Sequence, residues 1–272
     1  MTKPLLNPPC KGWQRDLPGP NVPPADAPDL VFEVPHHLDE VFLEISRRVM
    51  RYRGLPTLFS LPLVWCLIVG VWLYWDDWSL SSVAIMAFMT CLLGSLAWSG
   101  VRRDLASPRD EPIRFNRLRR KIYVYSFRHT WPNPFARWYV TTEAYDWDEI
   151  RAESWKLRGA TANGMLIINE GVSLAVVKRG TNEVIDRFHL SGSVQTSLWA
   201  YICTYMQNGP EALEPCDAPM RDANDTYNPI TRLAPKVQWP EAMDIESRTA
   251  PSSYSGAPAA GVLLCGQSPD PR

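Results

Sequence analysis

The sequence predicts an α+β membrane protein, in which a transmembrane hairpin of two helices precedes a small antiparallel β-domain with a closing helix. Three observations support this fold class. Two long segments, Leu55–Trp75 and Trp78–Val101, contain no Lys, Arg, Asp, Glu or His. Residues 111–210 consist of short β-rich runs between turn residues and end in one periodic helical segment. Prolines gather in residues 1–35 and after residue 210, which predicts disordered tails at both ends.

The first 54 residues divide into two parts. Residues 1–35 hold nine prolines and lack the apolar centre of a signal peptide, so we expect an extended, disordered arm. Residues 36–54 carry apolar side chains at three- and four-residue steps, which predicts an amphipathic helix. This helix lies either on the membrane surface or against the folded domain, and the sequence leaves both alternatives open. The apolar positions are Leu38, Val41, Phe42, Ile45, Val49 and Tyr52.

Residues 55–101 are predicted to form the transmembrane hairpin. A bilayer core about 30 Å thick is crossed by about 20 apolar residues in a helix, and both segments are long enough. Asp76 and Asp77 form the acidic turn between them. No ionisable residue lies inside either span, which argues against an ion path or a transporter.

The charges that flank the spans predict the orientation of the hairpin. Arginines precede the first span and follow the second, whereas the turn is acidic. Because Lys and Arg near membrane ends favour the cytoplasmic side, both termini should be cytoplasmic. The arginines are Arg47, Arg48, Arg51 and Arg53 before the hairpin, and Arg102, Arg103 and Arg109 after it.

A basic run follows the hairpin within about twenty residues and has two interpretations. It contacts anionic lipid, at about 1 kcal/mol per residue near the surface, or it is a topology signal combined with a polar hairpin turn. Nucleic-acid binding is disfavoured because no aromatic platform is interleaved with these charges. The lipid-facing candidates are Arg47, Arg48, Arg51, Arg102 and Arg103, together with Arg114, Arg117, Arg119, Arg120 and Lys121.

The β-domain is predicted to begin with a hairpin of Pro112–Asn116 and Lys121–Phe127. A helix with Val194, Leu198, Ile202 and Met206 on one stripe closes it and stops at Asn208–Gly209–Pro210. Residues 211–272 show no periodicity, and disorder is the default expectation there. Further strand candidates are Trp138–Thr142, Trp147–Lys156, Met165–Asn169, Ser173–Lys178 and Glu183–His189, the third and fourth split at Glu170–Gly171.

Motifs for catalysis are missing from the sequence. It contains no G-x-S-x-G, H-E-x-x-H, P-loop or G-x-G-x-x-G pattern, and none of the six cysteines forms a C-x-x-C pair. We therefore predict a non-enzymatic protein without cofactor or metal, whose cysteines are small apolar residues in a reduced compartment. Trp131, Arg137 and Trp138 are candidates for contact with a partner protein, because Trp and Arg dominate interface hot spots.

Three segments carry a resemblance to a known family: Asp110–Tyr125, Tyr145–Ile150 and Trp199–Pro210. Over about residues 34–210 the chain resembles an uncharacterised family of bacterial inner-membrane proteins with two spans and a pleckstrin-homology-like cytoplasmic domain. Members of that family are often encoded beside type VI secretion effectors.

The resemblance implies an immunity protein, which binds and neutralises a toxin effector at the inner membrane. An alternative is an adaptor or accessory factor that holds an effector or secretion component before export. A third hypothesis is an anionic-lipid sensor that uses residues 114–121. The expected partners are thus membrane lipid and one protein, with no nucleic acid, and a homo-oligomer is compatible with the sequence.

Overall fold

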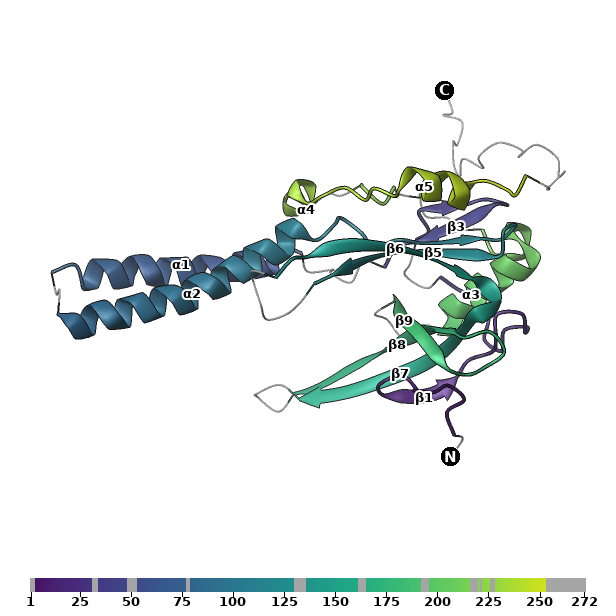
Figure 1. Ribbon diagram of the computed structural model, residues 1–272, viewed down its shortest axis with the longest axis horizontal. Coiled ribbons are helices and arrows are strands. Elements are labelled where there is room, and N and C mark those ends of the chain that lie inside the picture. Colours follow the sequence, from purple (N-terminus) through teal and green to yellow (C-terminus); the bar gives the residue numbers. More distant parts are fainter. Residues whose placement is uncertain are drawn as a thin grey trace, which may run out of the picture.

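In this computed structural model, the described residues are 3–30, 34–47, 53–76, 79–129, 136–160, 165–191, 196–215, 220, 222–225 and 228–252. Figure 1 shows a helical hairpin that projects from one end of a folded part built of two antiparallel sheets. The mixed α+β class and the two long apolar helices agree with the sequence prediction.

Apart from the first strand of the chain, the strands of the five-stranded sheet all precede the strands of the four-stranded sheet in the sequence. The five-stranded sheet has the order β2 (His37–Leu38), β3 (Phe42–Ile45), β4 (Ile113–Asn116), β5 (Lys121–Arg128) and β6 (Tyr139–Asp146). The four-stranded sheet has the order β1 (Trp13–Asp16), β7 (Ile150–Ala160), β8 (Leu166–Val177) and β9 (Val184–Ser191). A short 3₁₀ turn, η1 (Trp147–Glu149), leads from β6 into β7.

The helical hairpin is an insertion within the five-stranded sheet. Helices α1 (Leu55–Leu73) and α2 (Leu80–Ala106) lie between β3 and β4 in the sequence. These two strands are hydrogen-bonded neighbours, with Phe42 opposite Asn116 and Ile45 opposite Ile113. The chain therefore leaves the sheet, runs along both helices and returns to the adjacent strand.

The core lies between the two sheets and is closed by α3 (Thr196–Asn208). Trp147 is fully buried at its centre, with its ring centroid 5.4 Å from that of Trp199 on α3 and 6.2 Å from that of Phe115 on β4. The helix ends as predicted: the N–H of Gly209 donates to the carbonyl of Tyr205, and Gly209 has a φ of 91°. A positive φ at the residue that ends a helix favours glycine.

The prediction of an amphipathic helix over residues 36–54 is wrong for residues 37–45, which contain strands β2 and β3, while residues 48–52 lie outside the described residues. The carboxylate of Asp39 accepts hydrogen bonds from the backbone N–H groups of Val41 and Phe42, both at 2.7 Å, and thereby shapes the turn between the strands. All four residues of β3 are buried. In a short strand that is buried on both faces, apolar residues do not alternate with polar ones. Their spacing in the sequence therefore also fits a helix.

The N-terminal arm is ordered where the sequence predicted disorder. Strand β1 pairs with β7, and Leu6, Cys10 and Leu17 are buried. The indole N–H of Trp199 donates to the carbonyl of Pro18 at 2.9 Å. A proline-rich segment cannot form its own regular hydrogen bonds, but its carbonyls accept them from neighbouring elements.

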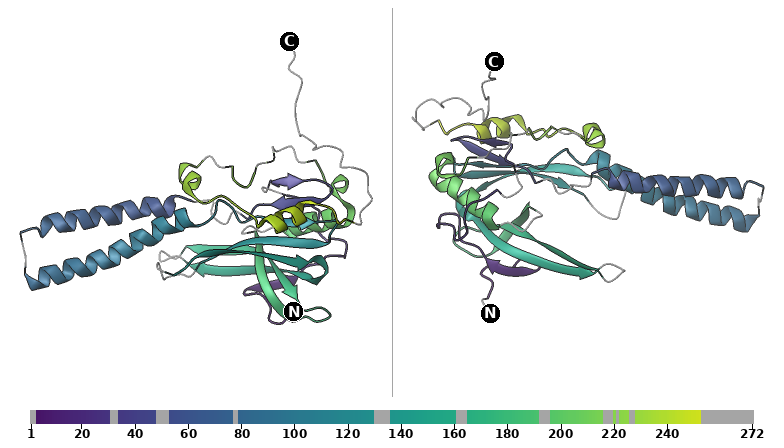
Figure 2. Two further views of the ribbon diagram at one scale, coloured as in Figure 1. Left: turned by 45° about the horizontal axis from the view of Figure 1, so that its top comes forward. Right: turned by 180° about the vertical axis from the view of Figure 1, so that it is seen from behind.

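The tail is also partly ordered, as residues 222–225 and 228–252, which we call the C-terminal strap. The strap contains α4 (Pro229–Leu233) and α5 (Glu241–Arg248), and the 3₁₀ turn η2 (Pro210–Ala212) precedes it. It runs along the outer face of the five-stranded sheet, from the base of the helical hairpin to β3 and β5 (Figures 1 and 2). Val237 and Ala223 pack there against Tyr125 of β5, and the ring of Trp239 lies 5.3 Å from that of Tyr125.

Most strand predictions after the hairpin are confirmed, including the β4–β5 hairpin, β9 and α3. One predicted break is wrong: β8 runs without interruption through Glu170 and Gly171. The pairing with β7 carries the strand through this point, because Gly171 lies opposite Trp155 and the carboxylate of Glu170 is 2.8 Å from the ammonium of Lys156.

We predict that Trp147→Ala destabilises the protein by about 3 to 5 kcal/mol, because it opens a cavity where both sheets and α3 meet. Denaturant unfolding of the full chain in detergent, followed by fluorescence, measures this loss. Ile185→Ala is the matched control, since Ile185 is 66% exposed and should change stability by less than about 0.5 kcal/mol. Equal effects of the two substitutions would contradict this position of the core.

Candidate functional site

The two helices present apolar side chains to their surroundings on nearly all sides. They contain 19 and 27 residues, which gives lengths of about 28 and 40 Å. In the most apolar 18-residue stretch of each helix, only 6% and 11% of the residues are buried. Both helices are long and apolar enough to span a membrane. Trp72 and Leu80 near the turn are 75% and 87% exposed. Asp77 and Trp78 lie outside the described residues.

The helices approach each other closely near the folded part. A Cβ on Gly100 would lie 2.7 Å from the carbonyl oxygen of Pro56 and 2.5 Å from the hydroxyl of Ser60. The hydroxyl of Ser60 is also 3.0 Å from the carbonyl of Ala97 on the other helix. Gly100 and Ala97 of the second span thus permit close packing.

A polar joint fixes the base of the hairpin. Asp104 of α2 is fully buried, and its carboxylate accepts hydrogen bonds from the backbone N–H of Thr57 at 2.9 Å and from the Thr57 hydroxyl at 2.6 Å. The guanidinium of Arg53 donates to the carbonyls of Asp104, Ser107 and Pro108. These bonds tie the first turn of α1 to the last turn of α2.

The C-terminal strap is attached to the same joint. The guanidinium of Arg109 donates to the carbonyls of Asn224, Arg232 and Ala234. The side-chain amide of Asn228, which caps α4, donates to the carbonyl of Arg53 at 2.8 Å. Helices, sheet and strap therefore meet in one hydrogen-bonded junction.

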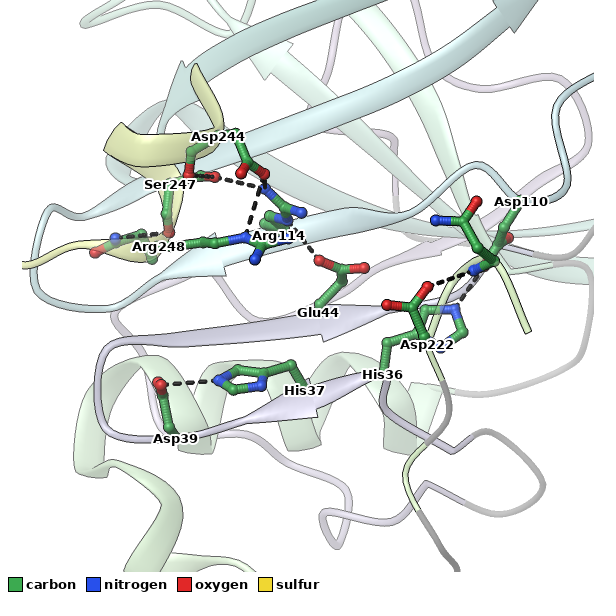
Figure 3. A network of polar contacts seen from close by, with 12 residues as sticks. His36, His37, Asp39, Glu44, Asp110, Arg114, Asp222, Asp244, Ser247 and Arg248 are labelled. Carbon is green, nitrogen blue, oxygen red and sulfur yellow. Dashed lines mark hydrogen bonds and ion pairs between the residues drawn. The ribbon is translucent and has the colours of Figure 1, made fainter. Parts of the chain in front are cut away.

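Arg114 is the centre of a second network, between β3, β4 and α5 (Figure 3). Its side chain is 2% exposed, and its guanidinium contacts the carboxylates of Glu44 at 2.5 Å and Asp244 at 2.6 Å. The same guanidinium donates to the hydroxyl of Ser247 at 2.9 Å and lies 4.5 Å from the ring centroid of Trp239. The prediction that Arg114 faces lipid is therefore wrong: it is an interior residue that holds the strap on the sheet.

The rest of the basic run is also engaged within the folded part. Lys121 pairs with Glu246 of α5 at 2.8 Å, and this hydrogen bond holds the pKa of Glu246 below its usual range. Arg119 donates to the carbonyls of Thr249 and Ala250 at the end of the strap. Arg120 contacts Asp148, Asn21 and the carbonyl of Met206. Arg117 is half-buried, with its guanidinium beside Gly209.

Arg47 is likewise an interior residue, which corrects its prediction as a lipid-facing group. It donates to the carbonyls of Glu111, Tyr125 and His189, and so links β5 to β9 across the two sheets. Burial lowers the pKa of its guanidinium, while the nearby Glu111 and Asp110 act in the opposite direction. Arg48 and Arg51 lie outside the described residues.

The remaining candidates lie near the base of the helices. Arg103 and Arg137 are exposed. Arg102 stacks on the ring of Trp138 at 4.4 Å and donates to the carbonyl of Ala136 at 2.9 Å. Trp138 is half-buried and joins α2 to the segment before β6, while Trp131 lies outside the described residues.

The buried thiols have no sign of activation. Burial raises the pKa of both Cys10 and Cys203 to about 12, so they are neutral at physiological pH. Cys66 and Cys91 are exposed on the apolar helices. Among the described residues, no group of three or more His, Cys, Asp or Glu could hold a metal ion.

The strap and its contacts were not predicted from the sequence. Trp239 and Val237, large apolar residues within a proline-containing segment, were the only available signal, because α4 and α5 are too short for a clear helical period. Asp244 and Ser247 stand one helical turn apart, but their partner Arg114 is distant in the sequence.

Comparison with known proteins gives one match. The family of unknown function DUF6708 matches residues 90–229, just over half of the chain, from within α2 to the start of α4. No curated protein and no solved structure matches the chain.

We predict that Glu44→Gln destabilises the protein by about 3 to 5 kcal/mol, because it leaves the buried charge of Arg114 poorly compensated. The double variant Glu44→Leu/Arg114→Met should cost less than the sum of its single substitutions. Chemical unfolding of the full chain measures both. Arg248→Met is the control, since Arg248 is exposed and contacts Asp244 at 3.2 Å. Additive effects in the double variant would refute a coupled pair.

Proposed function

Because the chain belongs to DUF6708, a family of unknown function, its role must be inferred from its own structure, and we propose a membrane-anchored protein whose folded part binds another protein. The proposed location is the cytoplasmic face of a bacterial inner membrane. The proposed role is non-enzymatic, with α1 and α2 as the anchor.

One observation carries the proposal: β3 and β4 pair with each other, although two exposed apolar helices lie between them in the sequence. If these helices cross a bilayer, adjacent paired strands require that the chain enters and leaves the membrane on the same side. An isolated pair of helices with this much exposed apolar surface is unstable in water. Lipid around both helices removes that surface from water.

The cytoplasmic orientation rests on the arginines that flank the hairpin. Arg53 and Arg103 lie at the base of the helices, and Asp76 lies at the turn. The positive-inside preference acts during insertion, when the flanking segments are not yet folded. Arginines that are later buried, such as Arg47, therefore still contribute to the orientation.

The order of the elements around and after the hairpin supports a pleckstrin-homology-like domain. Strands β3 to β6 form most of one antiparallel sheet, β7 to β9 form most of the other, and α3 follows and closes the core. The helical hairpin is then an insertion between the first two strands of that domain. Such folds serve many functions, so the domain type alone does not specify a partner.

The edge strand β6 offers a surface for a protein partner. In the described part of the chain, β6 is the last strand of its sheet and pairs on one side only, with β5. Tyr139 and Val140 are exposed at its start, next to exposed Arg137. A partner can add a strand to such an edge through main-chain hydrogen bonds, while an aromatic residue and an arginine provide specificity.

Immunity against a toxin effector is the specific role we propose for this binding. It follows from the resemblance noted in the sequence and from the β6 surface beside the membrane anchor. An adaptor that holds an effector before export is the second candidate, and it uses the same anchor and the same surface.

We expect a cytoplasmic reporter fused after the last residue to be active, and a periplasmic reporter inserted after Asp76 to be active as well. Both results follow if α1 and α2 span the membrane from the cytoplasmic side. Activity of a periplasmic reporter at the C-terminus would contradict the orientation. Release of the protein from membranes by alkaline carbonate would contradict the anchor.

Under the immunity role, co-expression with a toxin effector from an adjacent gene should restore growth, because the folded part would bind and neutralise the toxin. Arg137→Glu should weaken this rescue by reversing a charge at the proposed surface, whereas Lys178→Glu, at an exposed position between β8 and β9, should leave it intact. Under the adaptor role, deletion abolishes effector secretion but leaves self-protection unchanged. Absence of rescue would exclude the immunity role.

A further inference from the structure

The free end of the β7–β8 hairpin exposes an unusual amount of apolar surface. Four consecutive residues at the start of β8 and just before it are exposed: Met165 at 70%, Leu166 at 61%, Ile167 at 43% and Ile168 at 46%. Isolated exposed apolar residues are common in proteins, but a contiguous group of this kind marks an interaction surface.

Both faces of this end are apolar. In β8, Leu166 and Ile168 point to one side and Ile167 to the other, because side chains alternate along a strand. Leu157 of β7 lies opposite Asn169 and therefore on the same side as Ile167. A ribbon that lies on the protein core would have one apolar and one polar face, which this end does not have.

No described strand flanks the end of this ribbon. Strand β1 pairs with β7 only at Trp155 and before, and β9 pairs with β8 only from Val172 onwards. Beyond these positions β7 and β8 form a two-stranded ribbon by themselves. A ribbon of this kind is only marginally stable in water and gains stability from an apolar environment.

The ribbon points in the same direction as the helical hairpin. In all three views of Figures 1 and 2, the coloured part of β7 and β8 extends toward the side from which α1 and α2 project and ends near the level where these helices leave the folded part. This is the level that a membrane surface would occupy around the helices.

We infer that the end of the β7–β8 hairpin inserts its apolar side chains into the interfacial region of the same bilayer. This inference rests on the proposed membrane anchor, and its partner is lipid with anionic headgroups. Exposed Arg158 on the ribbon suits such headgroups. Asn169 and the ion pair of Lys156 with Glu170 follow directly behind the apolar residues and mark the depth at which insertion stops.

A second contact with lipid changes what the anchor does. With two helices alone, the helices and the folded part can tilt together relative to the membrane. A ribbon inserted to one side of the helices fixes the folded part in one orientation. The edge of β6 is then held in a constant position relative to the membrane.

The experiment uses the full chain in nanodiscs of neutral and anionic lipids. A polarity-sensitive fluorophore is attached to a single reactive cysteine, and lipids that carry a nitroxide near the headgroup or near the end of the acyl chain act as shallow and deep quenchers. Three samples are compared: Ile167→Cys in the ribbon, Ile185→Cys at the other end of the sheet, and native Cys66 in α1. The other accessible cysteines are replaced by serine in each sample.

We expect a blue shift and loss of fluorescence for the labels at positions 167 and 66, and neither change at position 185. Adding Leu166→Asp and Ile168→Asp should abolish quenching at position 167, while the helices keep the chain in the nanodisc. Quenching at position 66 without quenching at 167 overturns this inference and leaves the anchor in place. Loss of quenching at position 66 overturns the anchor itself.

A protein partner at the ribbon would give a different pattern. The label at position 167 would then stay unquenched in nanodiscs, and only native membranes would protect it from a water-soluble quencher. That outcome also overturns the assignment to lipid.

Discussion

The pairing of β3 with β4 determines how the helices, the two sheets and the strap are connected. These strands are neighbours in the sheet, yet all of α1 and α2 lies between them in the sequence. The pairing forces the two helices to lie side by side and to begin and end at the same edge of the folded part. It also makes the segment before the helices part of the same sheet as the segment after them, so neither segment completes the core alone.

Two buried arginines, Arg47 and Arg114, and two half-buried ones, Arg53 and Arg109, secure this arrangement. Arg47 links the two sheets, Arg53 and Arg109 bind carbonyl groups at the base of the helices, and Arg114 joins the sheet to the strap. Burial of a guanidinium is costly unless its donors are satisfied, and in each case carbonyls or carboxylates satisfy them. The strap therefore covers apolar surface and also supplies Asp244 and Ser247 as partners for the guanidinium of Arg114. Without the strap, Glu44 would be the main partner of this guanidinium.

The joint at Asp104 gives the proposed anchor a mechanical role. Because the helices, the sheet and the strap share hydrogen bonds there, a tilt of the helices would move the sheet with them. A partner bound at β6 would sense the orientation of the helices, and an inserted β7–β8 ribbon would restrict that orientation further. Anchor and folded part thus act as one body rather than as a tethered pair.

Local composition, periodicity and turn residues are enough to predict the two apolar helices, the β4–β5 hairpin, β9, and α3 with its end at Gly209. Long-range contacts are needed to explain why residues 37–45 form strands, why the arm and the strap are ordered, and why Arg47 and Arg114 are interior residues. Each of these depends on partners far away in the chain, such as β4 for β3, β7 for β1, and Glu44 with Asp244 for Arg114. A buried strand, a proline-rich segment and a charged side chain have no local pattern that reveals a distant partner, since pairing and desolvation exist only once the chain has folded.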